Sequence, residues 1–342
     1  MSTAALATSR LQARARILLP WLILAVLAIL PAAGLTPNLI RLLFITFVWV
    51  TASLAWNLLG GFAGQVSFGF AVFYGLGAYT AALMIDRGVN PYPSFLAAGL
   101  VPALASLLIG LPTFRLHGPY FAIATIGVSE ATRVVMNNFA ITGGASGFRI
   151  MESRPFRQVE HYYTALGMAA LAVAASFLIG HSKFGLGLRA IKQDEDAAAD
   201  LGVNPYLYKL AIHGVAAGFT GIAGGVFARY AAFIYPQGVF AFQTSVYILL
   251  MPVIGGIGTV WGAVLGGVIF GIVEEELVAN FPQIHLLLYG SLLILIILAE
   301  PDGLLGLLKK LFGRLRKPDG EHGNAHPGSR KADEVLRRAS GG

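Results

Sequence analysis

Residues able to do covalent chemistry are scarce in this chain. Its 342 residues include no cysteine, and its 7 histidines are scattered without an HExxH-like spacing. This excludes disulfides, thiolate metal sites and cysteine nucleophiles, and it argues against a metal site of any kind. No Ser/His/Asp or paired-acid constellation stands out, and no GxxxxGK[ST] phosphate-binding loop occurs. We therefore expect no catalytic residue, no metal and no cofactor held by this chain.

The polar pattern that does stand out suits docking rather than catalysis. Within Ser182–Tyr208, Asp196 precedes two alanines and Gly202 follows at a fixed offset. Two alanines leave one helix face flat enough for a partner's groove, and the acidic residues decorate its rim. Gly202 fits a left-handed helix end, and Asn204-Pro205 makes continuation difficult. Composition alone leaves two interpretations open, a docking helix or an ordinary solvated loop helix.

The rest of the chain is typical of a membrane protein. Hydrophobic residues make up 56% and charged residues 12%, with a mean hydropathy of +0.71. Soluble domains carry about 25% charged residues. We therefore expect an all-α, polytopic membrane helical bundle with about eight to ten transmembrane helices.

The elements that would position the polar stretch are apolar runs on both sides of it. The sequence predicts spans at Ile17–Leu35, Leu39–Leu59, Phe68–Ile85, Ser94–Leu111, Tyr120–Met136, Tyr162–Ile179, Leu210–Tyr230 and His285–Ala299. The first run could also be a signal peptide, but an uncleaved span is favoured. Gly238–Asn280 is interrupted by Pro252 and Gly255–Gly258, which predicts two spans with a tight turn, or a re-entrant pair.

The charges of the two tails set the expected orientation. Formal net charge is +7, and the surplus lies largely in the tails, so nucleic-acid binding is not expected. By the positive-inside rule, the basic tail 1–16 and the basic segment Lys309–Lys317 are cytoplasmic. The membrane domain is then 17–308, and the tail 309–342 is expected to be disordered. An even number of crossings places the loop 182–208 in the cytoplasm and Asn137–His161 outside.

Several polar residues near the spans are candidates for a translocation path. Gln65 and Ser67 lie within a glycine-rich break at Gly60–Phe70, where unwound backbone survives only if it is buried in protein or lines a cavity. Tight interhelical packing explains the same residues. The full set of candidates is Gln65, Ser67, Tyr79, Glu130, Arg133, Thr142, Gly143 and Gly144.

Each of the remaining candidates also has a plain structural interpretation. Glu130 and Arg133 are one helical turn apart, so they are either part of a path or gate, or a structural ion pair. Thr142-Gly143-Gly144 is either an external contact or an ordinary turn. Glycine pairs four residues apart, among them Gly221/Gly225 and Gly262/Gly266, indicate close helix packing.

The loop pattern resembles the EAA loop of bacterial ABC-importer permeases, Glu-Ala-Ala-x3-Gly followed after nine residues by Ile. Asp196 replaces the Glu, while Ala197, Ala198, Gly202 and Ile212 match, and His213–Val215 stand where that motif closes with Leu-Pro. The wider sequence resembles LivM-type permeases of branched-chain amino acid importers. The resemblance is carried, in family order, by Gly60–Leu83, Gly118–Val135, Thr142–Gly147, Phe184–Leu210 and Ile254–Gly267.

This resemblance implies a transport subunit of a bacterial inner-membrane importer rather than an enzyme. It implies a LivH-type second permease, two cytoplasmic ATPase subunits that bind the ATP, and a periplasmic substrate-binding protein. The loop would be a cytoplasmic coupling helix over Phe184–Gly202, with ATPase-coupling residues Arg189, Glu195, Asp196, Ala197, Ala198 and Gly202. Branched-chain or other amino acids are the expected substrates. Alternatives are the same machinery importing urea or another small solute, and a secondary transporter or channel without an ATPase.

Overall fold

The computed structural model describes residues 24–152, 155–281, 284, 287–288, 290–291 and 303–307. The chain divides into two units, Met1–Gly306 and Leu307–Gly342, and everything below concerns the first unit. The N-terminal tail, most of the predicted span at His285–Ala299 and nearly all of the C-terminal tail lie outside the described residues.

The described chain is built from helices. They are the short helix Leu24–Ala33 ending in η1 (Leu30–Ala33), α2 (Pro37–Trp56), η2 (Asn57–Phe62), α3 (Phe70–Asp86), α4 (Pro91–Thr113), α5 (Pro119–Asn138), η3 (Ala140–Thr142), η4 (Gly144–Ser146), α6 (Gln158–His181), α7 (Lys183–Gln193), α8 (Glu195–Asp200), α9 (Pro205–Ala231), α10 (Pro236–Val239), α11 (Phe242–Gly255) and α12 (Val260–Asn280). Five of them, in part joined end to end, are long and apolar enough to cross a membrane. The predicted all-α membrane fold is confirmed.

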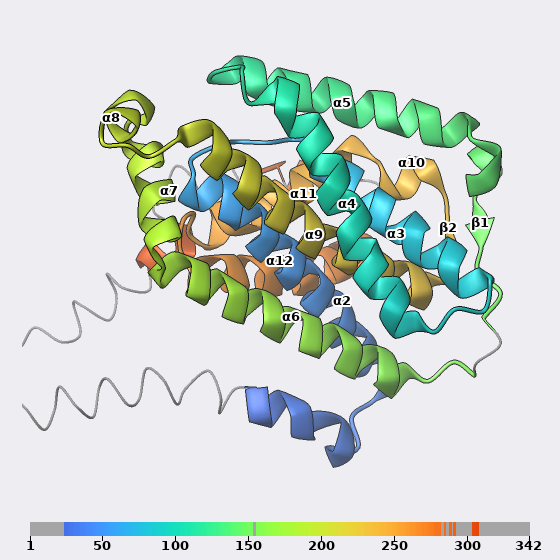
Figure 1. Ribbon diagram of the computed structural model, residues 1–342. Helices are drawn as coiled ribbons and strands as arrows, with labels where there is room; N and C mark the ends of the chain where they lie inside the picture. The colour runs from blue at the N-terminus through green and yellow to red at the C-terminus, as the bar shows by residue number, and fades with distance from the viewer. Residues whose placement is uncertain are drawn as a thin grey trace, which may run out of the picture. The chain divides into compact units, whose positions relative to one another are not determined.

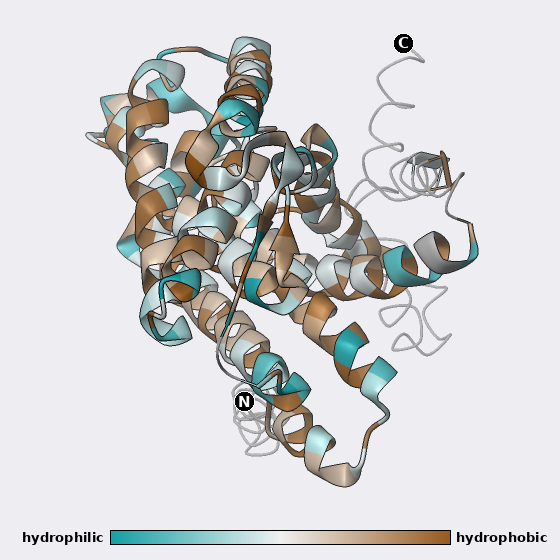
Figure 2. Ribbon diagram, turned by 90° about the vertical axis from the view of Figure 1, so that its right-hand side faces the viewer, coloured by the Kyte–Doolittle hydropathy of each residue, from teal (hydrophilic) through white to brown (hydrophobic). Residues whose placement is uncertain are grey.

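Apolar side chains on the outer faces of these helices explain why the fold needs lipid. On α4, Leu96, Leu100, Leu104 and Leu108 follow one another at four-residue spacing, and each is exposed. Figure 2 shows hydrophobic residues along much of the visible helix surface. A stripe of this kind is unfavourable in water and favourable in a bilayer.

Helix α9 lies at the centre of the packing, against α3 and α4 (Figure 1). The contacts are too close for larger side chains. A Cβ atom at Gly224 would lie 2.0 Å from the Tyr74 carbonyl oxygen, and one at Gly77 would lie 2.0 Å from the Gly221 carbonyl oxygen. The prediction that the glycine pairs serve packing is confirmed for Gly221 and for Gly262/Gly266, where added Cβ atoms would lie within 2.2 Å of backbone oxygens, whereas Gly214 and Gly218 have only ordinary contacts of 3.5–3.6 Å.

The connections between helices gather at two ends of the bundle, marked in Figure 1 by α7 and α8 on the left and by β1 and β2 on the right. At the α7 end, Lys192 Nζ donates to the Gly61 carbonyl, and the Tyr206 hydroxyl donates to the Leu111 carbonyl at 3.0 Å. At the other end, the Met151 amide donates to Asp86. Alternate connections therefore lie at opposite ends, as the predicted order of crossings requires.

Helices α11 and α12 form an antiparallel pair joined by a turn at Gly256–Gly258. The Gly258 amide donates to Asn57 at the α7 end, while Glu275, near the end of α12, pairs with Arg41 at the start of α2. Of the two interpretations of Gly238–Asn280, the structure supports two helices with a tight turn.

A small sheet at the right-hand end was not predicted. Strand β1 (Phe148–Arg149) pairs antiparallel with β2 (Phe233–Ile234), with Phe148 opposite Ile234. Strands of two residues carry too little alternation to be recognised from sequence. The pairing ties the loop after α5 to the end of α9.

Candidate functional site

Helix α7 is fixed against the helices before and after it. The Ser182 hydroxyl accepts a hydrogen bond from the Gly185 amide at 3.1 Å, which caps the start of the helix. Leu188 and Ile191 are buried, and the Phe184 ring stacks on Tyr208 with centroids 4.8 Å apart. The helix is amphipathic, and its apolar face packs onto the bundle while its polar face remains outside.

Arg189, one of the predicted coupling residues, holds α7 to the end of α6. Its guanidinium donates to the Gly180 carbonyl and, at 3.3 Å, to the Gly185 carbonyl. A cation at the carboxyl end of a helix is favourable because the last carbonyls lack helical partners. The geometry therefore gives Arg189 a positioning contact within the chain.

The predicted single coupling helix over Phe184–Gly202 is wrong in one respect, because the structure has two helices there. Asp194 is extended, with φ −158° and ψ 119°, and separates α7 from α8. Its carboxylate accepts from the Ala197 amide at 2.9 Å and caps α8. An aspartate followed by an acidic first turn is a helix-start signal that the sequence carries and that the prediction passed over.

Two further contacts fix the ends of α8. Glu195 forms an ion pair with Lys209 on α9, and the Lys209 side chain is only 5% exposed. At the other end, Gly202 has φ +86°, and the Val203 and Gly202 amides donate to the Ala198 and Ala199 carbonyls. This is the Schellman arrangement that favours glycine, as the sequence predicted for Gly202.

What α7 and α8 leave exposed is a short surface around the Asp-Ala-Ala pattern. Asp196 and Ala197 are exposed, whereas Ala198 is buried against the bundle. Beside them Leu201 is 83% exposed, the highest value among the large hydrophobic residues that the structure describes as exposed. Sequence reasoning missed Leu201; an aliphatic residue directly before a helix-ending glycine in a polar loop was the available signal. We call Asp196, Ala197 and Leu201 the loop surface.

Lys192 extends from α7 to the unwound end of the first long span. Its Nζ donates to the Gly61 carbonyl at 2.9 Å. Gly61 lies in η2, a π-helical turn that continues α2. In the same turn, the Asn57 side chain accepts from the Gly258 amide at 2.8 Å and donates to the Thr259 carbonyl at 3.1 Å. Neither Lys192 nor Asn57 was singled out from the sequence, because their partners lie more than 130 residues away.

The glycine-rich break was predicted correctly, and Gln65 and Ser67 lie in its non-helical part. Both side chains are buried, Ser67 completely. The Ser67 hydroxyl accepts from the Gly69 amide at 3.2 Å, and the Ser67 carbonyl accepts from the Trp56 indole at 2.8 Å. The backbone of this segment is thus bonded within the protein, which is the condition for unwound chain near lipid.

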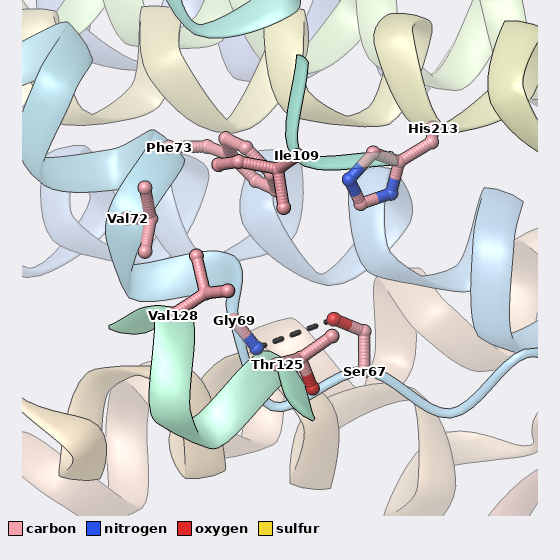
Figure 3. A pocket seen from close by; sticks show the side chains of 8 residues that line it. All are labelled: Ser67, Gly69, Val72, Phe73, Ile109, Thr125, Val128 and His213. Carbon is pink, nitrogen blue, oxygen red and sulfur yellow. Dashed lines mark hydrogen bonds between the residues drawn. The ribbon is translucent and has the colours of Figure 1, made fainter. Parts of the chain in front are cut away.

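A narrow cavity of about 10 Å³ lies where this segment meets four helices (Figure 3). Its lining consists of Ser67, Gly69, Val72, Phe73, Ile109, Thr125, Val128 and His213. His213 packs edge-on against Phe73 with centroids 5.0 Å apart, and neither ring nitrogen has a hydrogen-bond partner among the described residues. The space admits about one water molecule, so in this conformation it is a packing gap.

Glu130 and Arg133 form the predicted ion pair on α5. Arg133 Nε donates to Glu130 at 2.9 Å, and the Glu130 side chain is 52% exposed. Of the residues of α5, the structure buries Phe121, Thr125 and Ser129. One face of α5 is therefore uncovered in this chain, and it presents a charged pair. We call the side of α5 that carries Glu130 and Arg133 the outer face of α5.

Of the remaining path candidates, Tyr79 and Thr142 are buried, Gly144 is half-buried and Gly143 is exposed. The Tyr79 ring is buried and stacks on Phe240 with centroids 5.9 Å apart. The Thr142 hydroxyl donates to the Met136 and Phe139 carbonyls at 2.8 and 2.7 Å. Gly143 and Gly144 have positive φ angles, so this segment is a packed turn after α5. A role in translocation stays a prediction for all of them.

A buried ionic cluster at the β1–β2 end was also missed. Arg229 of α9 bonds Glu152 through two nitrogens, at 2.9 and 3.0 Å, and Glu160 of α6 at 2.9 Å. The Arg229 side chain is 2% exposed. This cluster fixes the loop before α6 to the end of α9. Elsewhere, the described residues include no group of three His, Cys, Asp or Glu placed to hold a metal ion, and the expectation of no metal stays a prediction.

Comparison with known proteins assigns residues 38–297 to the family described as "Branched-chain amino acid transport system / permease component". The chain is 30% identical to the high-affinity branched-chain amino acid transport system permease protein LivM of Salmonella typhimurium, over 77% of this chain and 69% of that protein. The LivM of Escherichia coli is also 30% identical, over 78% and 69%. LivH of Salmonella typhimurium is 25% identical, over 74% of this chain and 90% of that protein. No solved structure matches the chain significantly.

Proposed function

The chain belongs to the family of permease components of branched-chain amino acid transport systems, and on this premise we propose that it moves a branched-chain amino acid across the inner membrane under the drive of ATP. It is a multi-pass membrane subunit of an importer. ATP hydrolysis belongs to separate ATPase subunits, which dock on the loop surface. The relatives carry branched-chain amino acid transport in their names, and this supports leucine-like substrates.

The loop surface is the observation that carries the proposal. Asp196, Ala197 and Leu201 are presented on a helix capped at both ends and tied to α9 by the Glu195–Lys209 pair. A rigid, exposed surface with a small residue at its centre and an aliphatic residue beside it fits a groove on a partner. Because the loop is anchored to α6 and α9, a force on it reaches two spans directly.

The proposed partners follow from the same arrangement. Both LivM and LivH relatives match this chain, which supports a pair of related permeases around one path. The outer face of α5 is the surface we assign to that pair, because a charged Glu130–Arg133 pair is costly against lipid and acceptable at a protein interface or a water-filled path. A periplasmic binding protein delivers substrate to the β1–β2 end, and both chain termini face the cytoplasm.

Co-purification of the ATPase subunits tests the docking part. Replacing Ala197 with Trp puts a bulky ring in the middle of the loop surface, where a groove made for a small residue cannot accept it. We expect recovery of the ATPase with the tagged permease to fall about ten-fold or more, which corresponds to about 1.4 kcal/mol of binding free energy.

The matched control is Ala145→Trp, because Ala145 is also an exposed alanine but lies in η4, among the connections at the opposite end. It should leave recovery of the ATPase unchanged. Equal recovery from Ala197→Trp and wild type would reject the loop surface as the docking site.

A further inference from the structure

Lys192 meets the carboxyl end of a membrane-spanning helix. Helix α2 and η2 together form one helical segment, Pro37–Phe62, of 26 residues. The last carbonyls of a helix lack helical partners and carry a partial negative charge. The Lys192 ammonium donates to one of them, the Gly61 carbonyl, at 2.9 Å. A cation on α7 thus caps a helix that is distant in sequence.

Three segments converge at this contact with no spare room. A Cβ atom at Gly258 would lie 3.3 Å from Lys192 Nζ and 3.1 Å from the Gly61 oxygen. A Cβ atom at Gly61 would lie 2.0 Å from the Asn57 side-chain oxygen. Asn57 is 1% exposed and holds the α11–α12 turn through Gly258 and Thr259. Lys192 is an exposed residue, but its ammonium group lies in this close contact, so displacement of α7 would pull on the end of η2 and on the α11–α12 turn.

We propose that Lys192 and Asn57 are positioning residues that transmit displacement of α7 to the end of η2, to the unwound segment Ala63–Gly69 that follows it, and to the α11–α12 turn. This inference rests on the proposed function, in which an ATPase moves α7. The chain itself joins the loop to α6 and α9. The contacts of Lys192 and Asn57 add a second route by which a displacement of α7 can reach the other helices. The unwound segment in turn contacts α5, since the Phe68 amide donates to the Thr125 hydroxyl at 3.1 Å. The route therefore ends at the helix that carries Glu130 and Arg133.

The test is the number of leucine molecules imported per ATP hydrolysed by the importer reconstituted with its ATPase, second permease and binding-protein subunits. Lys192→Met keeps the aliphatic stem and removes the ammonium group. We expect leucine uptake per ATP to fall about five-fold or more, in the usual range for coupling between sites, while ATP hydrolysis persists. Lys183→Met is the matched control, because Lys183 is an exposed lysine on the same helix. It should keep the wild-type ratio.

Two outcomes would overturn the inference. One is a wild-type ratio for Lys192→Met. The other is loss of the ATPase subunits from the purified Lys192→Met complex, which would make Lys192 a docking contact. If the wild-type complex itself shows no ATP-dependent leucine uptake, the proposed function fails instead.

A second measurement reads the contact directly and needs no transport. A Cβ atom at Gly64 would lie 3.5 Å from Lys192 Cβ, within the range of a disulfide. The chain contains no native cysteine, so it offers no competing thiol of its own to a Lys192→Cys/Gly64→Cys pair. Because Gly64 has φ +73°, the Gly64→Cys single variant is first checked for normal assembly. Where it assembles normally, we expect a disulfide in the double variant, and its absence would contradict the close approach of α7 to the unwound segment.

Discussion

Lys209 and Glu195 form an ion pair whose two members are buried unequally. The Lys209 side chain is 5% exposed and the Glu195 side chain is 35% exposed. Removing a partner costs most when the group left behind is buried and charged, because that group has lost both water and its counter-ion. Substitutions of Glu195 and of Lys209 should therefore reduce the free energy of unfolding by different amounts, although each breaks the same ion pair.

We expect Glu195→Gln to destabilise the protein by about 1–3 kcal/mol, because it leaves the buried Lys209 ammonium without its carboxylate. Lys209→Met should cost less, since the half-exposed Glu195 can turn to water. Thermal unfolding of both variants in detergent measures the difference. A larger loss of stability for Lys209→Met would contradict the role that burial has in this argument.

Other residues show where sequence reasoning stops at this scale. The pattern identified Glu195, Asp196 and Ala197 as polar or small positions in a loop, but it could not tell that Glu195 is tied to α9 while Asp196 is free to meet a partner. Lys192 and Asn57 were passed over because their partners come from other parts of the chain. A single sequence reports local preferences and contains no direct record of long-range pairing.

At the scale of elements, the packing of α9 against α3 and α4 determines where the loop surface lies. Glycines at Gly77, Gly221 and Gly224 let the backbones approach so closely that no side chain fits between them. Small residues at helix contacts are a main source of helix association in lipid. Of these three glycines only Gly221 belongs to a predicted four-residue pair, so glycine spacing predicted the close packing in part and did not identify which helices meet.

Gly224→Ala tests this packing. The added Cβ would lie 2.0 Å from the Tyr74 carbonyl oxygen, so α3 and α9 must move apart. We expect a loss of about 1–3 kcal/mol of stability, the usual cost of overpacking, seen as a lower unfolding temperature in detergent. As a control, Gly167→Ala on α6 meets no atom within 4 Å. It should raise stability by about 0.5–1 kcal/mol, since glycine weakens a helix interior.

If both alanine variants unfold at the wild-type temperature, the α3–α9 contact is not tight.

Boundaries of elements were also predictable in part. Two predicted spans fall within observed helices: Leu39–Leu59 lies within α2 and η2 together, and Tyr162–Ile179 lies within α6. Hydropathy predicts them because the bilayer sets the length of an apolar helix. The break at Asp194 and the two-residue strands were not predicted, since capping and short pairing leave weak local signals.

At the scale of the whole membrane unit, two sets of connections lie at opposite ends, and each end has its own polar network. Lys192, Asn57 and the loop surface occupy one end. The Arg229–Glu152–Glu160 cluster and the β1–β2 pair occupy the other. The alternation of the helices between the two ends could be predicted from hydropathy, since lipid allows only helices and closed barrels to cross; the side that faces the cytoplasm stays a prediction from tail charge. The two polar networks could not be predicted from the sequence, because they depend on which helices pack together.

The proposed function gives this arrangement a direction of transport. In that proposal the ATPase acts where α7 and α8 are exposed, the binding protein delivers substrate where β1 and β2 lie, and the unwound segment and the outer face of α5 connect the two ends. Import of a leucine-like amino acid is the consequence if ATP acts at the first end and the binding protein at the second.

The most direct measurement is leucine uptake into proteoliposomes that contain the complete importer, with ATP supplied only on the α7–α8 side and the binding protein only on the β1–β2 side. The account predicts uptake that requires ATP on the α7–α8 side and is lost with Ala197→Trp. Leucine uptake that proceeds without ATP, or that is equal in Ala197→Trp and wild type, would contradict it.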